Sequence, residues 1–96
     1  MDKIFVWDEQ KNQKLIKERG VSFEAIVLYI EEGNIIGIVR GEDKFSHQKQ
    51  FLVAVNNYVY VIPFVEEEDR IFLKTIMPSR KMTKQFLAGG DFSEKT

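Results

Sequence analysis

The residues with the clearest chemical potential are basic side chains gathered between positions 70 and 90. This stretch contains no acidic residue, and its cations are Arg70, Lys74, Arg80, Lys81 and Lys84. The whole chain carries a net charge of only −1, so the acids must collect elsewhere. A near-neutral chain with one basic segment can still present a basic face to an anion. Alternatively, these side chains simply solvate the outside of a strand and a helix.

The junction Pro78-Ser79-Arg80-Lys81 is the most informative part of this stretch. Pro78 ends a strand and Ser79 can cap a helix, which places Arg80 and Lys81 in the first helical turn. Basic residues are mildly unfavourable there, because the helix dipole is positive at that end. Backbone N–H groups at a helix start, together with Ser79, Arg80 and Lys81, would suit a phosphate. The alternative is that both long side chains extend into water.

Two further residues could take part in chemistry. Lys74 lies in a predicted strand over residues 70–77, where it would share one face with Phe72 and Ile76. Lys74 is either a charge that keeps an edge strand from pairing with another chain or a group that points into a groove near Arg80. His47 is the single histidine and lies in a polar loop over residues 41–48. It could act as a general base or acid near neutral pH, or it is a surface histidine without a role.

Composition excludes several classes of site. The chain has no cysteine, which rules out disulfides, thiolate zinc sites and a cysteine nucleophile. One histidine cannot form a multi-histidine metal centre, and no nucleotide-binding fingerprint is present, so we expect neither metal nor cofactor. No apolar run reaches the roughly 18 residues of a membrane span, and the N-terminus lacks a signal-peptide pattern. We therefore expect a soluble cytoplasmic protein of bacterial type without a membrane partner.

The N-terminal half predicts a strand and two helices. The length of 96 residues and an apolar fraction of 44% fit one domain, which we place at residues 1–88 with a loose tail at 89–96. A strand at 4–7 precedes Asp8, which can cap a helix running to about Arg19, and Gly20 can end it in the left-handed conformation. Ser22 can cap a second helix, which Gly33 ends.

The C-terminal half predicts a meander of strands followed by a helix. Strands are expected at 35–40, 50–55, 58–65 and 70–77, with Asn56-Asn57 as a hairpin turn. Pro63 marks a bulge, an edge or a frayed strand end. A helix at 80–87 would turn Met82, Phe86 and Leu87 inward.

The order β-α-α-β-β-β-β-α predicts an α+β domain, in which two N-terminal helices and one C-terminal helix pack on one side of a mostly antiparallel sheet of four to five strands. The other face would be more open.

Two segments carry a resemblance to a known family. The first runs Phe5-Val6-Trp7-Asp8, then Lys11, Asn12 and Lys14, then Arg19-Gly20-Val21-Ser22-Phe23-Glu24; the second runs from Asp69 to Lys81. Together they resemble the BrnT-type toxins of bacterial type II toxin–antitoxin systems, which are similar to the small RelE ribonucleases. Many members of that family end the last strand with Ser-Ala-Arg ahead of a basic helix, whereas this chain has Thr75-Ile76-Met77.

The resemblance implies a RelE-like fold and metal-independent cleavage of RNA. In that reaction the ribose 2′-hydroxyl attacks the adjacent phosphorus, which requires a base, an acid and cations. On the matching positions, Arg80 and Lys81 would hold the scissile phosphate, Lys74 would stabilise charge or donate a proton, and His47 would be the base or acid. Arg70, Ser79 and Lys84 would bind the flanking phosphates.

The resemblance also implies a partner, a cognate antitoxin with a DNA-binding half and a segment that covers the basic groove. The competing interpretation is a catalytically inactive domain of the toxin fold that acts as a partner-binding or regulatory protein.

Overall fold

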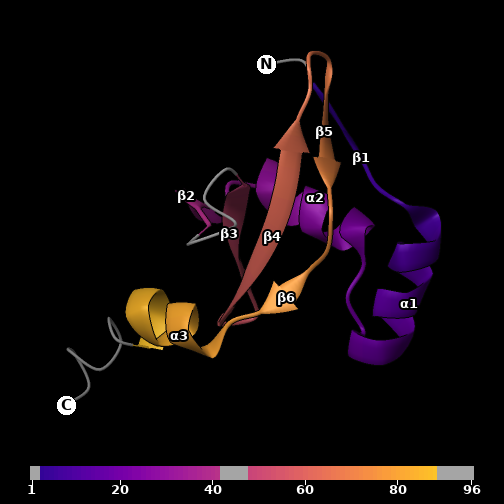
Figure 1. Cartoon of the computed structure of the whole chain (residues 1–96). Coiled ribbons are helices and arrows are strands. Elements are labelled where there is room, and N and C mark those ends of the chain that lie inside the picture. The colour runs from indigo at the N-terminus through magenta and orange to yellow at the C-terminus, as the bar shows by residue number, and fades with distance from the viewer. Residues whose placement is uncertain (1–2, 42–47, 89–96) are drawn as a thin grey trace.

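The computed structural model describes residues 3–41 and 48–88, which form an α+β domain (Figure 1). Strand β1 (Ile4–Val6) leads into helix α1 (Glu9–Arg19), and helix α2 (Phe23–Glu31) follows directly. The predicted caps are confirmed. Asp8 accepts hydrogen bonds from the N–H groups of residues 10 and 11, and Gly20 ends α1 with a φ of 70°. Ser22 accepts from the N–H of residue 25 at the start of α2.

The remaining strands build a sheet that is larger than predicted. They are β2 (Ile35–Arg40), β3 (Lys49–Val55), β4 (Tyr58–Glu66), β5 (Arg70–Leu73) and β6 (Met77–Pro78). Within the described residues the sheet has six strands in the order β1-β5-β4-β3-β2, and β6 also pairs with β4. The additional member is β6, which is the detached end of the predicted last strand, while the predicted β1 pairs in parallel with β5.

The hairpin between β3 and β4 forms as the sequence predicts. Asn56 and Asn57 have φ angles of 53° and 64°, the left-handed values that a tight two-residue turn of this hand requires. The turn places β4 next to β3 on one side and next to β5 and β6 on the other. Strand β4 is therefore central and buried on both faces through most of its length.

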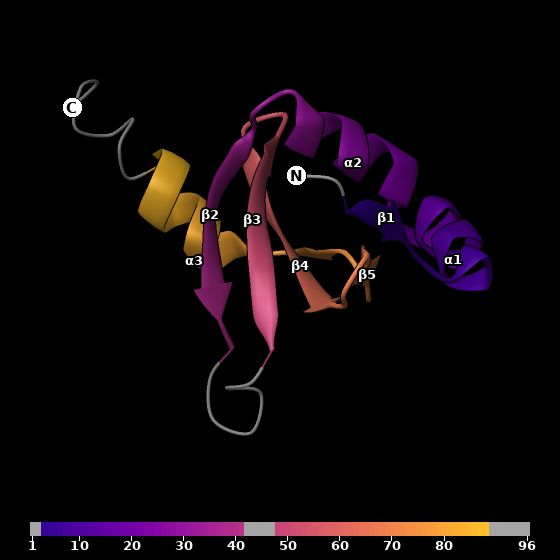
Figure 2. The ribbon, with the colours of Figure 1, turned by 90° about the horizontal axis from the view of Figure 1, so that it is seen from above.

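The helices cover both faces of the sheet, which corrects the expectation that all three lie on one side. Helices α1 and α2 pack with the larger core, which contains Leu15, Phe23 and Ile26 together with the alternate residues Phe51 and Val53 of β3. The C-terminal helix α3 (Arg80–Thr83) and the π-helical turn η2 (Lys84–Ala88) pack on the opposite face. There, Met82 and Leu87 contact a smaller cluster of Leu52, Val59 and Val61. Figure 2 shows α2 and α3 on different sides of β3 and β4.

A bulge interrupts the predicted strand 70–77. Phe64 of β4 pairs with Leu73, and Val61 pairs with Met77, so the two residues between 61 and 64 face three residues, 74 to 76. The extra residue shifts the alternation, and Leu73 and Ile76 are both fully buried in the larger core. Lys74 and Ile76 therefore do not share a face as predicted.

Two contacts explain why the bulge lies there. The backbone N–H of Lys74 donates to the carbonyl of Pro63 at 2.8 Å. In an antiparallel ladder the N–H and C=O of one residue point to the same side, so the missing N–H of Pro63 faces the bulge, where a regular ladder would need it. On the other side of the bulge, Arg19 Nη1 of α1 donates to the carbonyl of Ile76 at 2.5 Å. Pro63 thus marks a bulge, one of the outcomes that the sequence allowed.

None of the helices in the described part of the chain is long and apolar enough to cross a membrane.

Candidate nucleic-acid interface

The C-terminal helix brings three of the predicted cations together. Arg80, Lys81 and Lys84 are all exposed, while Met82 and Thr83 between them face the sheet. The backbone N–H of Lys84 donates to the carbonyl of Arg80, so these two residues lie one helical turn apart. Like charges at that spacing destabilise a helix by a few tenths of a kcal/mol. With no acid between residues 70 and 90, the arrangement suits an external anion.

The helix is anchored to β4 by hydrogen bonds that use the predicted serine. Ser79 Oγ accepts from the N–H of Met82 at 3.1 Å, and the backbone N–H of Ser79 donates to the carbonyl of Val59 at 3.0 Å. Thr83 Oγ1 accepts from the buried N–H of Val59 at 2.8 Å and donates to the carbonyl of Ser79 at 2.7 Å. Ser79 therefore caps the helix and fixes its place on the sheet, and Arg80 follows immediately.

Lys74 lies along the same edge of β4, but it does not adjoin Arg80. Its backbone N–H bonds to Pro63, whereas that of Ser79 bonds to Val59. Four residues of extended strand separate the two acceptors, which corresponds to about 13 Å. Lys74 is exposed, like Arg80. At this separation the two residues suit different anionic groups of one extended ligand better than a single phosphate.

Arg70 belongs to a different part of the molecule. It begins β5 next to the end of β4, and its Nε donates to Glu67 Oε1 at 2.7 Å. This hydrogen bond, supported by the charge of the same carboxylate, raises the pKa of Arg70. The hairpin that joins β4 and β5 lies at the top of Figure 1, whereas β6 and α3 lie at the bottom. Arg70 is therefore distant from Arg80 and already paired.

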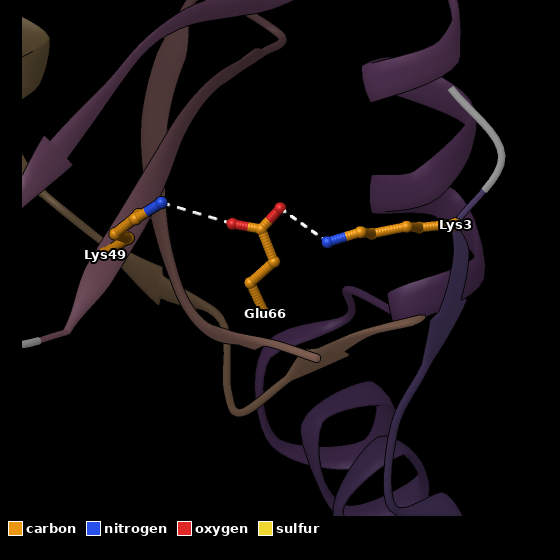
Figure 3. Close-up of polar contacts among 3 residues, drawn as sticks. All are labelled: Lys3, Lys49 and Glu66. Atoms are coloured by element: carbon orange, nitrogen blue, oxygen red, sulfur yellow. Dashed lines mark hydrogen bonds and ion pairs between the residues drawn. The ribbon is translucent and has the colours of Figure 1, made fainter. Parts of the chain in front are cut away.

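The acidic run beside Arg70 forms a second, mixed-charge surface. Glu66 lies between two lysines, with Lys3 Nζ at 2.8 Å and Lys49 Nζ at 3.1 Å (Figure 3). Hydrogen bonds from Lys3 and then Lys49 lower the pKa of Glu66. These three residues line a hollow with Phe64, Val65 and the next two glutamates. Three carboxylates against two lysines make this hollow a poor site for an anion.

His47, the proposed base or acid, lies outside the described residues. Within the described ranges, no group of three or more histidine, aspartate or glutamate side chains is arranged to hold a metal ion.

Residues of the N-terminal segment that carries the family resemblance make contacts that stabilise the fold. Trp7 stacks on Phe23 with ring centroids 5.6 Å apart. Asn12 is fully buried, and its side chain accepts from the N–H of Phe23 and donates to Glu24. The side chain of Arg19 supports the bulge 57 residues away in sequence. Sequence reasoning missed this last contact, because a basic residue in the last turn of a helix is common and indicates only a favourable dipole interaction.

Comparisons with family models, curated proteins and solved structures found no match to this chain.

Proposed function

We propose that this chain is the toxin component of a type II toxin–antitoxin system, a metal-independent endoribonuclease of the BrnT and RelE kind. The observation that carries the proposal is the row of exposed cations on one edge of the sheet. Arg80 and Lys81 of α3 and Lys84 at the start of η2 are all exposed. The backbone of Lys74 bonds to β4 about 13 Å along the strand from that of Ser79. A cationic track of this kind suits the backbone of single-stranded RNA.

In the proposed reaction the 2′-hydroxyl oxygen bonds to phosphorus and the bond from phosphorus to the 5′-oxygen breaks. The products are a 2′,3′-cyclic phosphate and a 5′-hydroxyl. Arg80 and Lys81 hold the scissile phosphate and stabilise its developing charge, and His47 is the remaining candidate for base or acid. Lys74 is too far along β4 to act on the same phosphate and contacts another one. Lys84 contacts a flanking phosphate. Arg70 has no part in the track, because its guanidinium is held by Glu67.

The test is incubation of the purified protein with single-stranded RNA in the presence of EDTA. We expect fragments that end in a cyclic phosphate, and we expect Arg80→Gln with Lys81→Gln to reduce the cleavage rate by about 100-fold. The matched control is Lys14→Gln, which removes an exposed charge from α1. Full cleavage by the double variant would remove the assignment of these residues.

A specific observation favours a second candidate, a toxin-fold domain that binds without catalysis. Among the described residues of the track, Arg80 and Lys81 can hold a phosphate, but the backbone of Lys74, the candidate for proton transfer, is bonded about 13 Å along β4 from that of Ser79. Cations without an acid or base in reach of the phosphate bind RNA without cleaving it. RNA that is bound but remains intact, both alone and with ribosomes, would select this alternative. Either way, the expected protein partner is an antitoxin whose acidic segment covers the track.

A further inference from the structure

The gap between Lys74 and Arg80 is occupied by a cation from the other end of the chain. Arg19 closes α1, and its Nη1 donates to the carbonyl of Ile76. Ile76 precedes Met77, which pairs with Val61 of β4. Val61 lies on β4 midway between Pro63 and Val59. The carbonyl of Pro63 accepts from the N–H of Lys74, and the carbonyl of Val59 accepts from the N–H of Ser79. Arg19 therefore meets the edge between the backbone positions of Lys74 and Ser79.

The edge is open to Arg19 because strand β1 is short. Its pairing with β5 ends at Val6, opposite Phe72, so none of the described strands continues along the outer side of the bulge. The chain instead turns into α1, whose last residue returns to Ile76. In Figure 1 the end of α1, the strand β6 and helix α3 follow one another along the bottom of the molecule.

The hydrogen bond to Ile76 leaves most of the guanidinium unused. A guanidinium has five N–H donors in a planar fork, and one of them contacts the Ile76 carbonyl. Arg19 is exposed as a residue, and within the described residues its side chain makes no further hydrogen bond or ion pair. A planar fork of this kind binds a phosphate in a bidentate manner.

We infer that Arg19 is an RNA-binding residue, which holds the phosphate between those bound at Lys74 and Arg80 while it fastens the bulge. This inference rests on the proposed function and deepens it, because it turns two separated basic positions into one continuous track. The track runs from Lys74 at the bulge, past Arg19 at the end of α1, to the exposed cations that begin at Arg80. The residues that the sequence predicts to contact RNA lie between positions 47 and 84 and do not include Arg19.

The experiment measures binding of a fluorescent 2′-O-methyl RNA strand over a series of salt concentrations. This probe lacks the attacking hydroxyl, so binding is read without cleavage. Arg19→Gln removes the charge and keeps a polar side chain with N–H donors. We expect it to reduce the slope of log affinity against log salt by about 0.7, the value of one phosphate contact on a single strand. Arg19→Lys should keep the slope, and the control Lys14→Gln should leave both slope and affinity unchanged.

The outcomes separate the two proposals. If the wild-type protein binds no RNA, both the proposed function and the inference that Arg19 binds RNA are wrong. If the wild type binds but Arg19→Gln has the same slope and affinity, Arg19 has a structural role alone and only this inference is wrong. Should Arg19→Gln fail to fold, the NMR signal of the Arg19 Nε–H group in the wild type decides. We expect that signal to shift when RNA is added, and an unchanged signal would overturn the inference.

Discussion

The side-chain oxygen of Asn12 accepts a hydrogen bond at 2.8 Å from the backbone N–H of Phe23, which joins the first half of α1 to the first residue of α2. The N–H groups at a helix start have no partner within the helix. Ser22 satisfies the N–H of residue 25, and Asn12 satisfies that of Phe23 from another helix. Asn12 is fully buried and also donates to Glu24 at 2.9 Å, so it fixes the angle between the two helices with no side-chain polar atom left unpaired.

We predict that Asn12→Leu lowers the free energy of unfolding by about 1 to 3 kcal/mol. Leucine has a similar volume but leaves the N–H of Phe23 without an acceptor in a buried position. Urea denaturation measures the change, and Gln10→Ala on the exposed side of α1 is the control. Wild-type stability in Asn12→Leu would show that the hydrogen bond contributes nothing net.

A second prediction concerns Thr83, which joins the C-terminal helix to the sheet. Its hydroxyl accepts from the buried N–H of Val59 and donates to the carbonyl of Ser79. Thr83→Val keeps the shape and removes both bonds, so we expect a loss of about 1 to 3 kcal/mol in thermal unfolding. Thr83→Ser keeps the hydroxyl and should lose clearly less. Equal losses in the two variants would assign the effect to packing instead of hydrogen bonding.

A third prediction concerns the turn between β3 and β4. Asn57 adopts a φ of 64°, a conformation that glycine adopts without a steric cost and β-branched residues strongly resist. We expect Asn57→Gly to raise the free energy of unfolding by up to about 1 kcal/mol, since Asn-Gly is the preferred pair for this turn. Asn57→Val should lower it by about 1 to 2 kcal/mol. Chemical denaturation of both variants checks the opposite signs, and a shared sign would contradict the turn assignment.

The first half of the fold was predictable because its signals are local. Asp8, Gly20 and Ser22 act on groups within four residues of themselves, so the helix boundaries follow from short-range chemistry. The same holds for Asn56 and Asn57 at the hairpin turn. The α+β class follows from the order of these elements.

The last strand was not predictable in the same way, because its bulge depends on distant residues. Pro63 on a neighbouring strand and Arg19 on the first helix determine where the alternation shifts. The inward orientation predicted for Phe86 is also wrong, since its side chain is 40% exposed. The chain changes from α-helix to π-helix after Thr83, and the wider turn no longer follows the spacing used for the prediction.

The candidate site was predictable only in part, for a related reason. Adjacency in the sequence brings Arg80, Lys81 and Lys84 together on one helix. Separation along β4 keeps Lys74 apart, and the pairing of β5 with the far end of β4 removes Arg70. Whether two cations share a ligand depends on strand register, which a basic segment in the sequence does not reveal.

A final prediction concerns the pH dependence of Glu66, which lies between Lys3 and Lys49. Hydrogen bonds from these lysines lower its pKa in the folded state, the larger effect coming from Lys3. The folded state therefore binds this proton less tightly than the unfolded chain does. The resulting stabilisation is fully present above the unfolded pKa of about 4.3 and is lost as pH falls through the lower folded value.

Carboxyl NMR titration measures this directly, and we expect the midpoint of Glu66 to lie below the ordinary glutamate range. Lys3→Gln should raise the midpoint more than Lys49→Gln, in the order of the two hydrogen bonds. High salt should raise the midpoint as well, because the three side chains are partly exposed and their charges are screened. A midpoint that neither variant moves would mean that both ion pairs are open in solution.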